Sequence, residues 1–303
     1  MRKLRIGTRG SELALWQANE VQKRLLDIGI LGEIEIIKTT GDKRADVSLA
    51  SIGGKGLFLK EIEDALDRGE VDLAVHSLKD VPSIVPERFT LAAFLERADP
   101  RDAWIQRDRI PIAQMREGSV VGTSSPRRRA QLVRRYPQIR VDEIRGNVDT
   151  RLKKVQQGSY DGAVLAAAGL RRLGRESEAT SYFPVDEIVP AAGQGIVVIE
   201  TLSRREDITR DVEPLTHRSS ALAAHCERGV LQKFGTLLDC YSSIAVHATV
   251  DDARIRVSAF VSDANGEKPI EVRDDDPDPG ALIERVYQTL KKEGAERLLT
   301  AAL

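Results

Sequence analysis

The stretch GEVDLAVHSLKDVP, residues 69–82, is the part of the sequence that decides the fold. The mostly apolar run from Val71 to Val75 predicts a buried strand, and Pro82 prevents that strand from continuing. The polar turn between them carries Asp80 together with a histidine, a serine and a lysine. A carboxylate at the end of a buried strand is costly unless it is used or paired. We therefore expect Asp80 to lie at the centre of a cleft that is otherwise lined with arginine.

Strands and helices alternate on both sides of this stretch, through most of the first 200 residues. We expect strands at residues 4–7 and 33–39. Helices are expected at 11–27 and 57–68, because apolar residues recur there every three to four positions. Such alternation is typical of α/β proteins with largely parallel sheets.

The second block of the sequence repeats this order. GEVDLAV at 69–75 is echoed by GSYDGAV at 158–164, and IGT at 6–8 is echoed by VGT at 121–123. Two similar α/β lobes that face one another explain these echoes, although a strand, a turn and a helix in succession are common in proteins. Residues that break regular structure at 96–102 and 189–195 mark where the chain would cross between the lobes.

Three domains are therefore predicted. Residues 1–97 with 196–215 form the first lobe, residues 98–195 the second, and residues 216–303 a small third α/β domain. The third domain is expected to contain a helix at 221–234, strands near 243–250 and 255–261, and a final helix at 280–293. The segment DDDPDP at 274–279 is interpreted as a solvated turn.

The chain as a whole is close to neutral, with 46 basic and 47 acidic residues among 303, which disfavours a nucleic-acid binder. No apolar stretch has the length of a signal peptide or of a membrane span. We therefore expect a cytoplasmic protein with no membrane partner. Its two cysteines, Cys226 and Cys240, are too few for a disulfide framework.

Positive charge is concentrated in one segment. Residues 116–156 include eleven basic residues and only four acidic ones. Arginine can hold a carboxylate or a phosphate through two hydrogen bonds, so a ligand with several anionic groups is implied. The arginines that we assign to this ligand are Arg127, Arg128, Arg145 and Arg151. A solvated helix face better explains the arginines at 129, 134 and 135.

Two turns have the composition of a helix start that binds anions. In GTSSPRR, residues 122–128, Ser125 suits the N-cap and Pro126 suits the first helical position. Free backbone N–H groups and the positive end of the helix make such a turn an anion site. The segment TRGS at 8–11 has the same character. Each lobe thus offers one anion-binding turn.

Spacing argues against other kinds of site. The loop GGKG at 53–56 lacks the Walker spacing and the Ser or Thr that follows its lysine, which disfavours nucleotide binding. The histidines at 217, 225 and 247 and the two cysteines lack paired zinc-ligand spacing, so no metal site is predicted. Cys226 lies in a helical pattern and is expected to be packed. Cys240 is the better candidate for a reactive thiol, with a buried structural cysteine as the open alternative.

Seven motifs, in order along nearly the whole chain, resemble the porphobilinogen deaminase family, also called hydroxymethylbilane synthase. They are TRGSELAL at 8–15, IGGKGLF at 52–58, AVHSLKDVP at 74–82, ERADPRD at 96–102, GTSSPRR at 122–128, RGNVDTR at 145–151 and PAAGQG at 190–195. The resemblance implies that the first two domains are shaped like the lobes of type 2 periplasmic binding proteins. It also implies a monomeric transferase of tetrapyrrole and heme biosynthesis.

The resemblance further implies a dipyrromethane cofactor, attached by a thioether to Cys240. The family adds four porphobilinogen units in turn to this cofactor, loses ammonia each time, and releases hydroxymethylbilane by hydrolysis. Asp80 is implied to be catalytic, because a carboxylate within hydrogen-bond reach stabilises the positive charge on pyrrole nitrogens and can manage the protons.

Binding roles follow from the same resemblance, because every pyrrole brings an acetate and a propionate that need counter-charges. The cofactor-binding positions are Lys79, Thr123, Ser125, Arg127, Arg128, Arg145 and Arg151. The substrate-binding positions are Arg9, Ser11, Lys55, Phe58, Arg172 and Gln194.

The loop around the cysteine departs from the family pattern. Leu238 and Asp239 precede Cys240 where the family commonly has two glycines, and Tyr241 and Ser242 follow it. Two rival interpretations stay open: a non-enzymatic two-lobe anion-binding protein, and a member of the family that has lost turnover.

Overall fold

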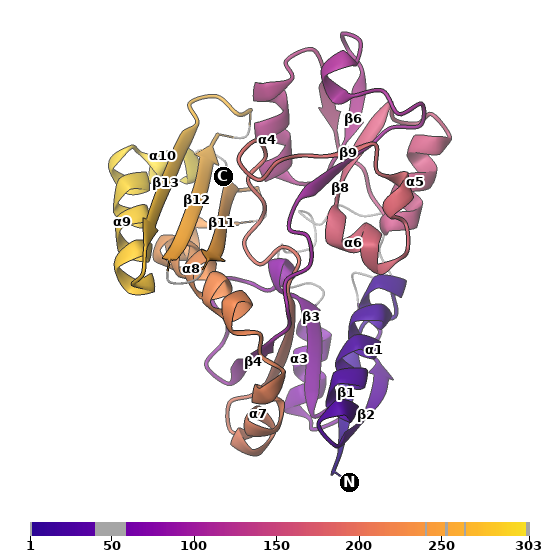
Figure 1. Ribbon diagram of the computed structural model, residues 1–303, viewed down its shortest axis with the longest axis vertical. Coiled ribbons are helices and arrows are strands. Elements are labelled where there is room, and N and C mark those ends of the chain that lie inside the picture. Colours follow the sequence, from indigo (N-terminus) through magenta and orange to yellow (C-terminus); the bar gives the residue numbers. More distant parts are fainter. Residues whose placement is uncertain (1, 40–58, 240, 252–253, 264, 301–303) are drawn as a thin grey trace. The chain divides into compact units, whose positions relative to one another are not determined.

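Figure 1 shows the computed structural model, which describes residues 2–39, 59–239, 241–251, 254–263 and 265–300. The chain divides into two compact units, one of Met1–Ala98 with Gly195–Leu222 and the other of Asp99–Gln194 with Ala223–Leu303. The finer division into three domains stays a prediction. In the part of the chain that is described, no helix is long and apolar enough to cross a membrane.

The first unit is built on a five-stranded sheet in the order β2-β1-β3-β10-β4. Its strands are β1 (Arg2–Thr8), β2 (Ile30–Ile36), β3 (Leu73–Ser77), β4 (Phe89–Phe94) and β10 (Val197–Leu202). β1 runs parallel to both β2 and β3, whereas β10 is antiparallel to β3 and β4. Because β10 comes from far downstream, the chain leaves this unit and returns to complete its sheet.

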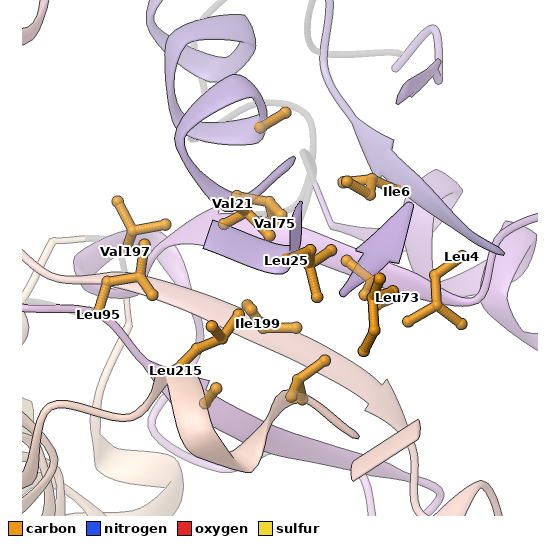
Figure 2. Packing of buried hydrophobic residues seen from close by; sticks show 14 of the residues in the cluster. Leu4, Ile6, Val21, Leu25, Leu73, Val75, Leu95, Val197, Ile199 and Leu215 are labelled. Atoms are coloured by element: carbon orange, nitrogen blue, oxygen red, sulfur yellow. The ribbon is translucent and has the colours of Figure 1, made fainter. Parts of the chain in front are cut away.

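Helices cover β3 on both of its faces. The helices α1 (Glu12–Asp27), α3 (Lys60–Asp67) and α7 (Glu206–Val212) belong to the described part of this unit. Leu73 and Val75 pack with α1 in the cluster shown in Figure 2, whereas Ala74, on the opposite face, packs with α3. Burial on both faces explains why this strand reads as an apolar run and not as an alternating pattern. The strand predicted before His76 is confirmed.

The second unit contains a five-stranded sheet in the order β7-β6-β8-β5-β9. Its strands are β5 (Asp102–Ile105), β6 (Val120–Gly122), β7 (Arg140–Asp142), β8 (Gly162–Ala166) and β9 (Ser181–Tyr182), and its helices are α4 (Pro126–Arg135), α5 (Val148–Gln156) and α6 (Ala167–Arg172). β6 is parallel to β7 and β8, and β5 is antiparallel to β8 and β9. Strand directions therefore follow the same order as in the first sheet. The predicted α/β class with two similar lobes is confirmed.

The second unit also holds a three-stranded antiparallel sheet in the order β11-β12-β13. Its strands are β11 (Ser243–Asp251), β12 (Arg254–Ser262) and β13 (Ile270–Asp276), and α8 (Arg218–Phe234), α9 (Pro279–Lys292) and α10 (Ala295–Thr300) complete the chain. In Figure 1, α9 lies against β13. Ala245 and Phe260 of this sheet form one buried cluster with Ala130 of α4 and with Val189. This cluster joins the small sheet to the five-stranded part of the unit.

The interpretation of residues 274–279 as a solvated turn is wrong for residues 274–276, whereas residues 277 and 278 form an exposed connection. Asp274 to Asp276 form the end of β13 and pair with β12, and α9 begins directly afterwards at Pro279. Arg285 of α9 donates to Asp274 at 2.9 Å and to Asp276 at 2.7 Å. This arginine supplies the counter-charge that lets an acidic segment continue an edge strand.

Candidate active site

Asp80 ends a short 3-10 helix, η2 (Leu78–Asp80), that follows directly from β3. The backbone N–H of Leu78 donates to Ile196 O at 3.0 Å, and that of Val81 donates to Leu78 O at 3.1 Å. Leu78 is buried, whereas Asp80 is exposed. The turn is therefore held from within, and it presents the carboxylate at the carboxyl end of β3 without the desolvation cost that a buried carboxylate would carry.

The predicted turn at Arg9 and Ser11 lies at the same edge of the same sheet. β1 and β3 are parallel neighbours, so the residues that follow them meet at the carboxyl ends of the strands, where ligands of α/β proteins bind. Ser11 is the N-cap of α1, as its composition suggested. Further along α1, Gln17 Nε2 donates to Ser77 Oγ at 2.7 Å. This bond ties α1 to the last residue of β3, just before the turn that carries Asp80.

A buried pair that the sequence did not reveal lies on the α3 side of this sheet. His76 Nε2 is 2.9 Å from Glu200 Oε2, with His76 7% exposed and Glu200 0% exposed. Burial first, and then the charge of Glu200, raise the pKa of Glu63 on α3. No spacing in the sequence links residues 76 and 200, because they meet only when β10 joins the sheet next to β3.

The helix start that was predicted at Ser125 and Pro126 is confirmed in the other unit. Ser125 is the N-cap of α4, where its Oγ accepts from Arg128 N at 3.4 Å, and Pro126 takes the first helical position. Thr123 is 5% exposed, and its Oγ1 accepts from Ser125 N at 3.2 Å. The turn thus combines hydroxyl groups with the positive end of a helix.

Arg145 and Arg151 gather at the neighbouring turn of the same sheet. Arg151 Nε donates to Gly146 O at 2.8 Å, and Arg145 Nη2 donates to Glu143 Oε2 at 2.7 Å. β6 and β7 are parallel neighbours, so the turn before α5 and the turn before α4 lie at one sheet edge. Four of the predicted cofactor-binding residues therefore lie at or just after the carboxyl ends of these strands: Thr123, Ser125, Arg145 and Arg151.

Arg127 and Arg128 bind a buried carboxylate that sequence reasoning did not identify. Asp102, the first residue of β5, is 0% exposed, and the two arginines are 4% and 6% exposed. Arg127 Nη1 donates to Asp102 Oδ2 at 2.8 Å, and Arg128 Nη2 donates to Oδ1 at 2.7 Å. Gln194 Nε2 donates to the same Oδ1 at 2.9 Å. Three predicted site residues thus share one anion of the protein itself.

The electrostatic balance of this cluster favours the charged form of Asp102. Burial alone would raise the pKa of Asp102, but the charges of Arg127 and Arg128 outweigh burial and hold that pKa well below its ordinary value. Asp102 is the last residue of the ERADPRD motif at 96–102, and membership of that motif was the one sequence feature that could have identified it. Its role as a counter-ion depends on the fold, since α4 follows much later in the chain.

The other predicted residues are more dispersed. Lys79 is half-buried beside Asp80, and Arg172 is half-buried at the end of α6. Lys55, Phe58 and Cys240 lie outside the described residues. The exposed helix face expected for Arg129, Arg134 and Arg135 is confirmed: all three are exposed, and Arg134 forms an ion pair with Glu271.

The two cysteines differ in their surroundings. Cys226 is 0% exposed, and burial raises the pKa of its thiol to about 11, so the packed cysteine predicted from the sequence is confirmed. The segment that flanks Cys240 is organised by Asp239. Its Oδ1 accepts from Tyr241 N at 2.8 Å and from Ser242 Oγ at 2.9 Å. The residues that depart from the family pattern therefore form a turn with its own hydrogen bonds.

A family model described as "Porphobilinogen deaminase, dipyromethane cofactor binding domain" matches residues 4–210. The porphobilinogen deaminase of Thiobacillus denitrificans is 42% identical over 305 residues, which cover 99% of each chain. That of Nitrosomonas europaea is 41% identical over 304 residues, which cover 99% of this chain and 98% of the other.

Solved structures with a similar fold include the VFT2 domain of Bordetella pertussis BvgS, with a TM-score of 0.43 and 16% identity over 71% of this chain and 85% of that domain. They also include the methionine-binding protein MetQ, with a TM-score of 0.43 and 11% identity over 70% of this chain and 89% of the other.

Proposed function

The chain belongs to the porphobilinogen deaminase family, and we propose on this basis that it joins four porphobilinogen molecules head to tail. Each addition releases one ammonia, and hydrolysis yields hydroxymethylbilane. This is a transferase reaction of tetrapyrrole biosynthesis.

The observation that carries this proposal is the exposed carboxylate of Asp80, held on a fixed turn next to the turn of Arg9 and Ser11. Loss of ammonia from the aminomethyl group of the substrate leaves positive charge shared with the pyrrole nitrogen. A carboxylate that accepts the pyrrole N–H stabilises this charge and can take up a proton. Arg9 and Ser11, at the same sheet edge, bind the acetate and propionate of the incoming substrate.

Residues of the second unit fit a dipyrromethane cofactor attached by a thioether to Cys240. Such a group carries an acetate and a propionate on each ring, and it needs donors. Thr123 and Ser125 offer hydroxyl groups at the start of α4, and Arg145 and Arg151 offer guanidinium groups at the start of α5. When bound, the cofactor supplies the free pyrrole carbon to which the first substrate is joined. Lys79 is proposed as a further cofactor-binding residue.

Arg127 and Arg128 bind the cofactor through the guanidinium N–H groups that do not donate to other groups of the protein. A guanidinium has five N–H donors. Arg127 makes two bonds inside the protein, to Asp102 and Val189, and Arg128 makes three, to Asp102 and Val164. Asp102 thereby fixes the planes of both arginines, and the remaining N–H groups receive carboxylates.

Four further residues are proposed to bind the substrate: Gln194, Arg172, Lys55 and Phe58. Gln194 uses its Nε2 on Asp102, while its buried Oε1 has no hydrogen-bond partner among the described residues. A buried acceptor without a partner is costly, and a pyrrole N–H of the substrate would satisfy it. Lys55 and Arg172 would bind substrate carboxylates, and Phe58 would contact a pyrrole ring.

Intact mass spectrometry tests the proposal and separates it from its rivals. Protein produced with access to porphobilinogen should carry a covalent dipyrromethane, and added porphobilinogen should give a ladder of heavier species. A static adduct without a ladder would indicate a family member that has lost turnover. No adduct would indicate a non-enzymatic anion-binding protein. An adduct that persists in Cys240→Ser would refute the attachment site.

The protein is further proposed to be a cytoplasmic monomer. Light scattering on the purified protein should give the mass of one chain, and the mass of two chains would contradict the second part of this proposal.

A further inference from the structure

A buried carboxylate on α8 joins two segments of the second unit that are far apart in the sequence. Glu227 is 0% exposed. Its Oε2 accepts the backbone N–H of Gly193 at 2.6 Å, and its Oε1 accepts that of Ala248 at 2.7 Å. The ring Nδ1 of His247, a residue that is 4% exposed, lies 3.4 Å from Oε1. Each oxygen of Glu227 thus holds a different segment.

On the side of Gly193, the connection continues to the arginine pair. Gly193 has a φ of 73°, a conformation that other residues adopt only with strain. The next residue, Gln194, donates to Asp102 at 2.9 Å, and Asp102 binds Arg127 and Arg128. From Glu227 to the two guanidinium groups, every link is therefore a hydrogen bond or a stretch of backbone.

On the side of Ala248, the contact holds an edge strand. β11 lies at the edge of the sheet β11-β12-β13, and an edge strand presents N–H groups that have no neighbouring strand to accept them. Glu227 supplies the acceptor for one of these groups. β11 begins at Ser243, shortly after Cys240. The strand that Glu227 holds is thus the one that leads away from the proposed attachment residue.

The chemistry at this point requires a carboxylate. Two N–H donors face two oxygens, so an amide would keep one acceptor and place its NH₂ group against the other donor. An apolar side chain would leave both buried N–H groups without partners, which is also unfavourable. A group that only filled space between α8 and the sheet would need neither oxygen.

We propose that Glu227 is a positioning residue for the reaction, which fixes strand β11, the strand that follows the proposed attachment residue, relative to the arginine pair of the second lobe. This inference rests on the proposed function, because it matters only if Cys240 carries the cofactor and the arginines bind it. Glu227 acts through Gly193 and Ala248, and not by contact with the substrate.

Glu227→Gln tests the proposal in the full-length enzyme. The variant should fold, but the amides of Gly193 and Ala248 should exchange hydrogen about tenfold faster or more, because one of them loses its acceptor and the other keeps only an uncharged one. Turnover per cofactor-loaded enzyme should fall by about tenfold with KM unchanged, since misplacing a reactive group affects the chemical step. A merely structural role would leave turnover per loaded enzyme at the wild-type value.

Glu284→Gln is the matched control. It removes the carboxylate that pairs with Lys233 across α8 and α9 at the surface, and it should change neither quantity. Wild-type turnover and wild-type amide exchange in Glu227→Gln would overturn the inference while the proposed function stands. If wild-type protein forms no adduct and no ladder, the proposed function itself fails.

A measurement on the wild type covers the case in which the variant does not fold. Loading the cofactor should increase the protection of the Gly193 and Ala248 amides by the same factor, because one carboxylate holds both. Protection of one amide without the other would overturn the proposal.

Discussion

Asp80 is exposed on a turn that the buried Leu78 and two backbone hydrogen bonds hold in place. Asp80→Asn should therefore leave the free energy of unfolding within about 0.5 kcal/mol of the wild type, as surface substitutions do. Turnover per loaded enzyme should fall by about a hundredfold or more, because an amide no longer neutralises the developing positive charge. Urea unfolding and steady-state kinetics measure the two effects.

Glu87→Gln controls for the loss of an exposed carboxylate in the same unit. It should change neither the free energy of unfolding nor the turnover per loaded enzyme. Near-normal turnover of Asp80→Asn would contradict the catalytic role of Asp80.

Asp102 has the opposite profile, because it is buried between two arginines. Asp102→Asn should lower the free energy of unfolding by about 3–5 kcal/mol, since it leaves buried guanidinium charges without their counter-ion. The arginines hold the pKa of Asp102, against the effect of burial, well below its ordinary value. This stabilisation is therefore fully present above the unfolded-state pKa of about 4, and it is lost as the pH falls below that value.

Urea unfolding at several pH values tests this prediction. The difference between wild type and Asp102→Asn should narrow as the pH falls below about 4. Asp99→Asn removes a partly exposed pair with Arg101 and should cost only about 0–1 kcal/mol. An equal cost for both substitutions would mean that burial of the cluster does not determine its contribution.

For the cluster of Asp102 with Arg127 and Arg128, the sequence identified the two arginines and missed the aspartate. Arg127 and Arg128 were recognisable because they follow a segment, Ser125 and Pro126, with the composition of a helix start. Asp102 was not, because its partners come from a helix that begins more than twenty positions later. His76 and Glu200 were hidden for the same reason, since a residue's partner across a sheet is set by strand order and not by spacing.

Among the elements, α4 begins with a cap that can be tested directly. Ser125 Oγ accepts from Arg128 N, and Ser125 itself has extended backbone. Ser125→Ala should lower the free energy of unfolding by about 1 kcal/mol. Ser125→Gly should lower it by only a few tenths of a kcal/mol. Ser119→Ala, a half-buried serine in the same unit, is the control and should be close to neutral. A glycine variant less stable than the alanine variant would contradict capping as the cause.

Elements with a clear period were predicted, and short or charged strands were not. The strand β3 was recognisable because both of its faces are buried, and α1 because its apolar residues follow a helical period. β5 was missed because it begins with Asp102, whose charge becomes compatible with burial only once α4 is in place. β13 was misread because its last three residues are acidic, and their counter-charge, Arg285, comes from the next helix.

For the molecule as a whole, the sequence predicted two α/β lobes and a further α/β region, because strand, turn and helix segments recur along the chain. In each unit, the turns that are predicted to bind anions lie at the carboxyl ends of parallel strands. The expectation that Asp80 faces the arginines across a shared cleft stays a prediction, since it concerns residues of two different units.

Thiol labelling tests the fold of the second unit and the attachment site together. Cys226 is 0% exposed, and burial raises the pKa of its thiol to about 11, so at pH 8 only about one thiol in a thousand is ionised. Iodoacetamide should therefore label one cysteine, Cys240, in native protein prepared without the cofactor, and neither cysteine in the loaded enzyme. Native Cys240→Ser should not be labelled.

In urea, Cys226 should react as well, because an exposed thiol has a pKa of about 8.5. Its labelling rate then reports how often the second unit opens, and rapid labelling of Cys226 in native protein would contradict its buried position.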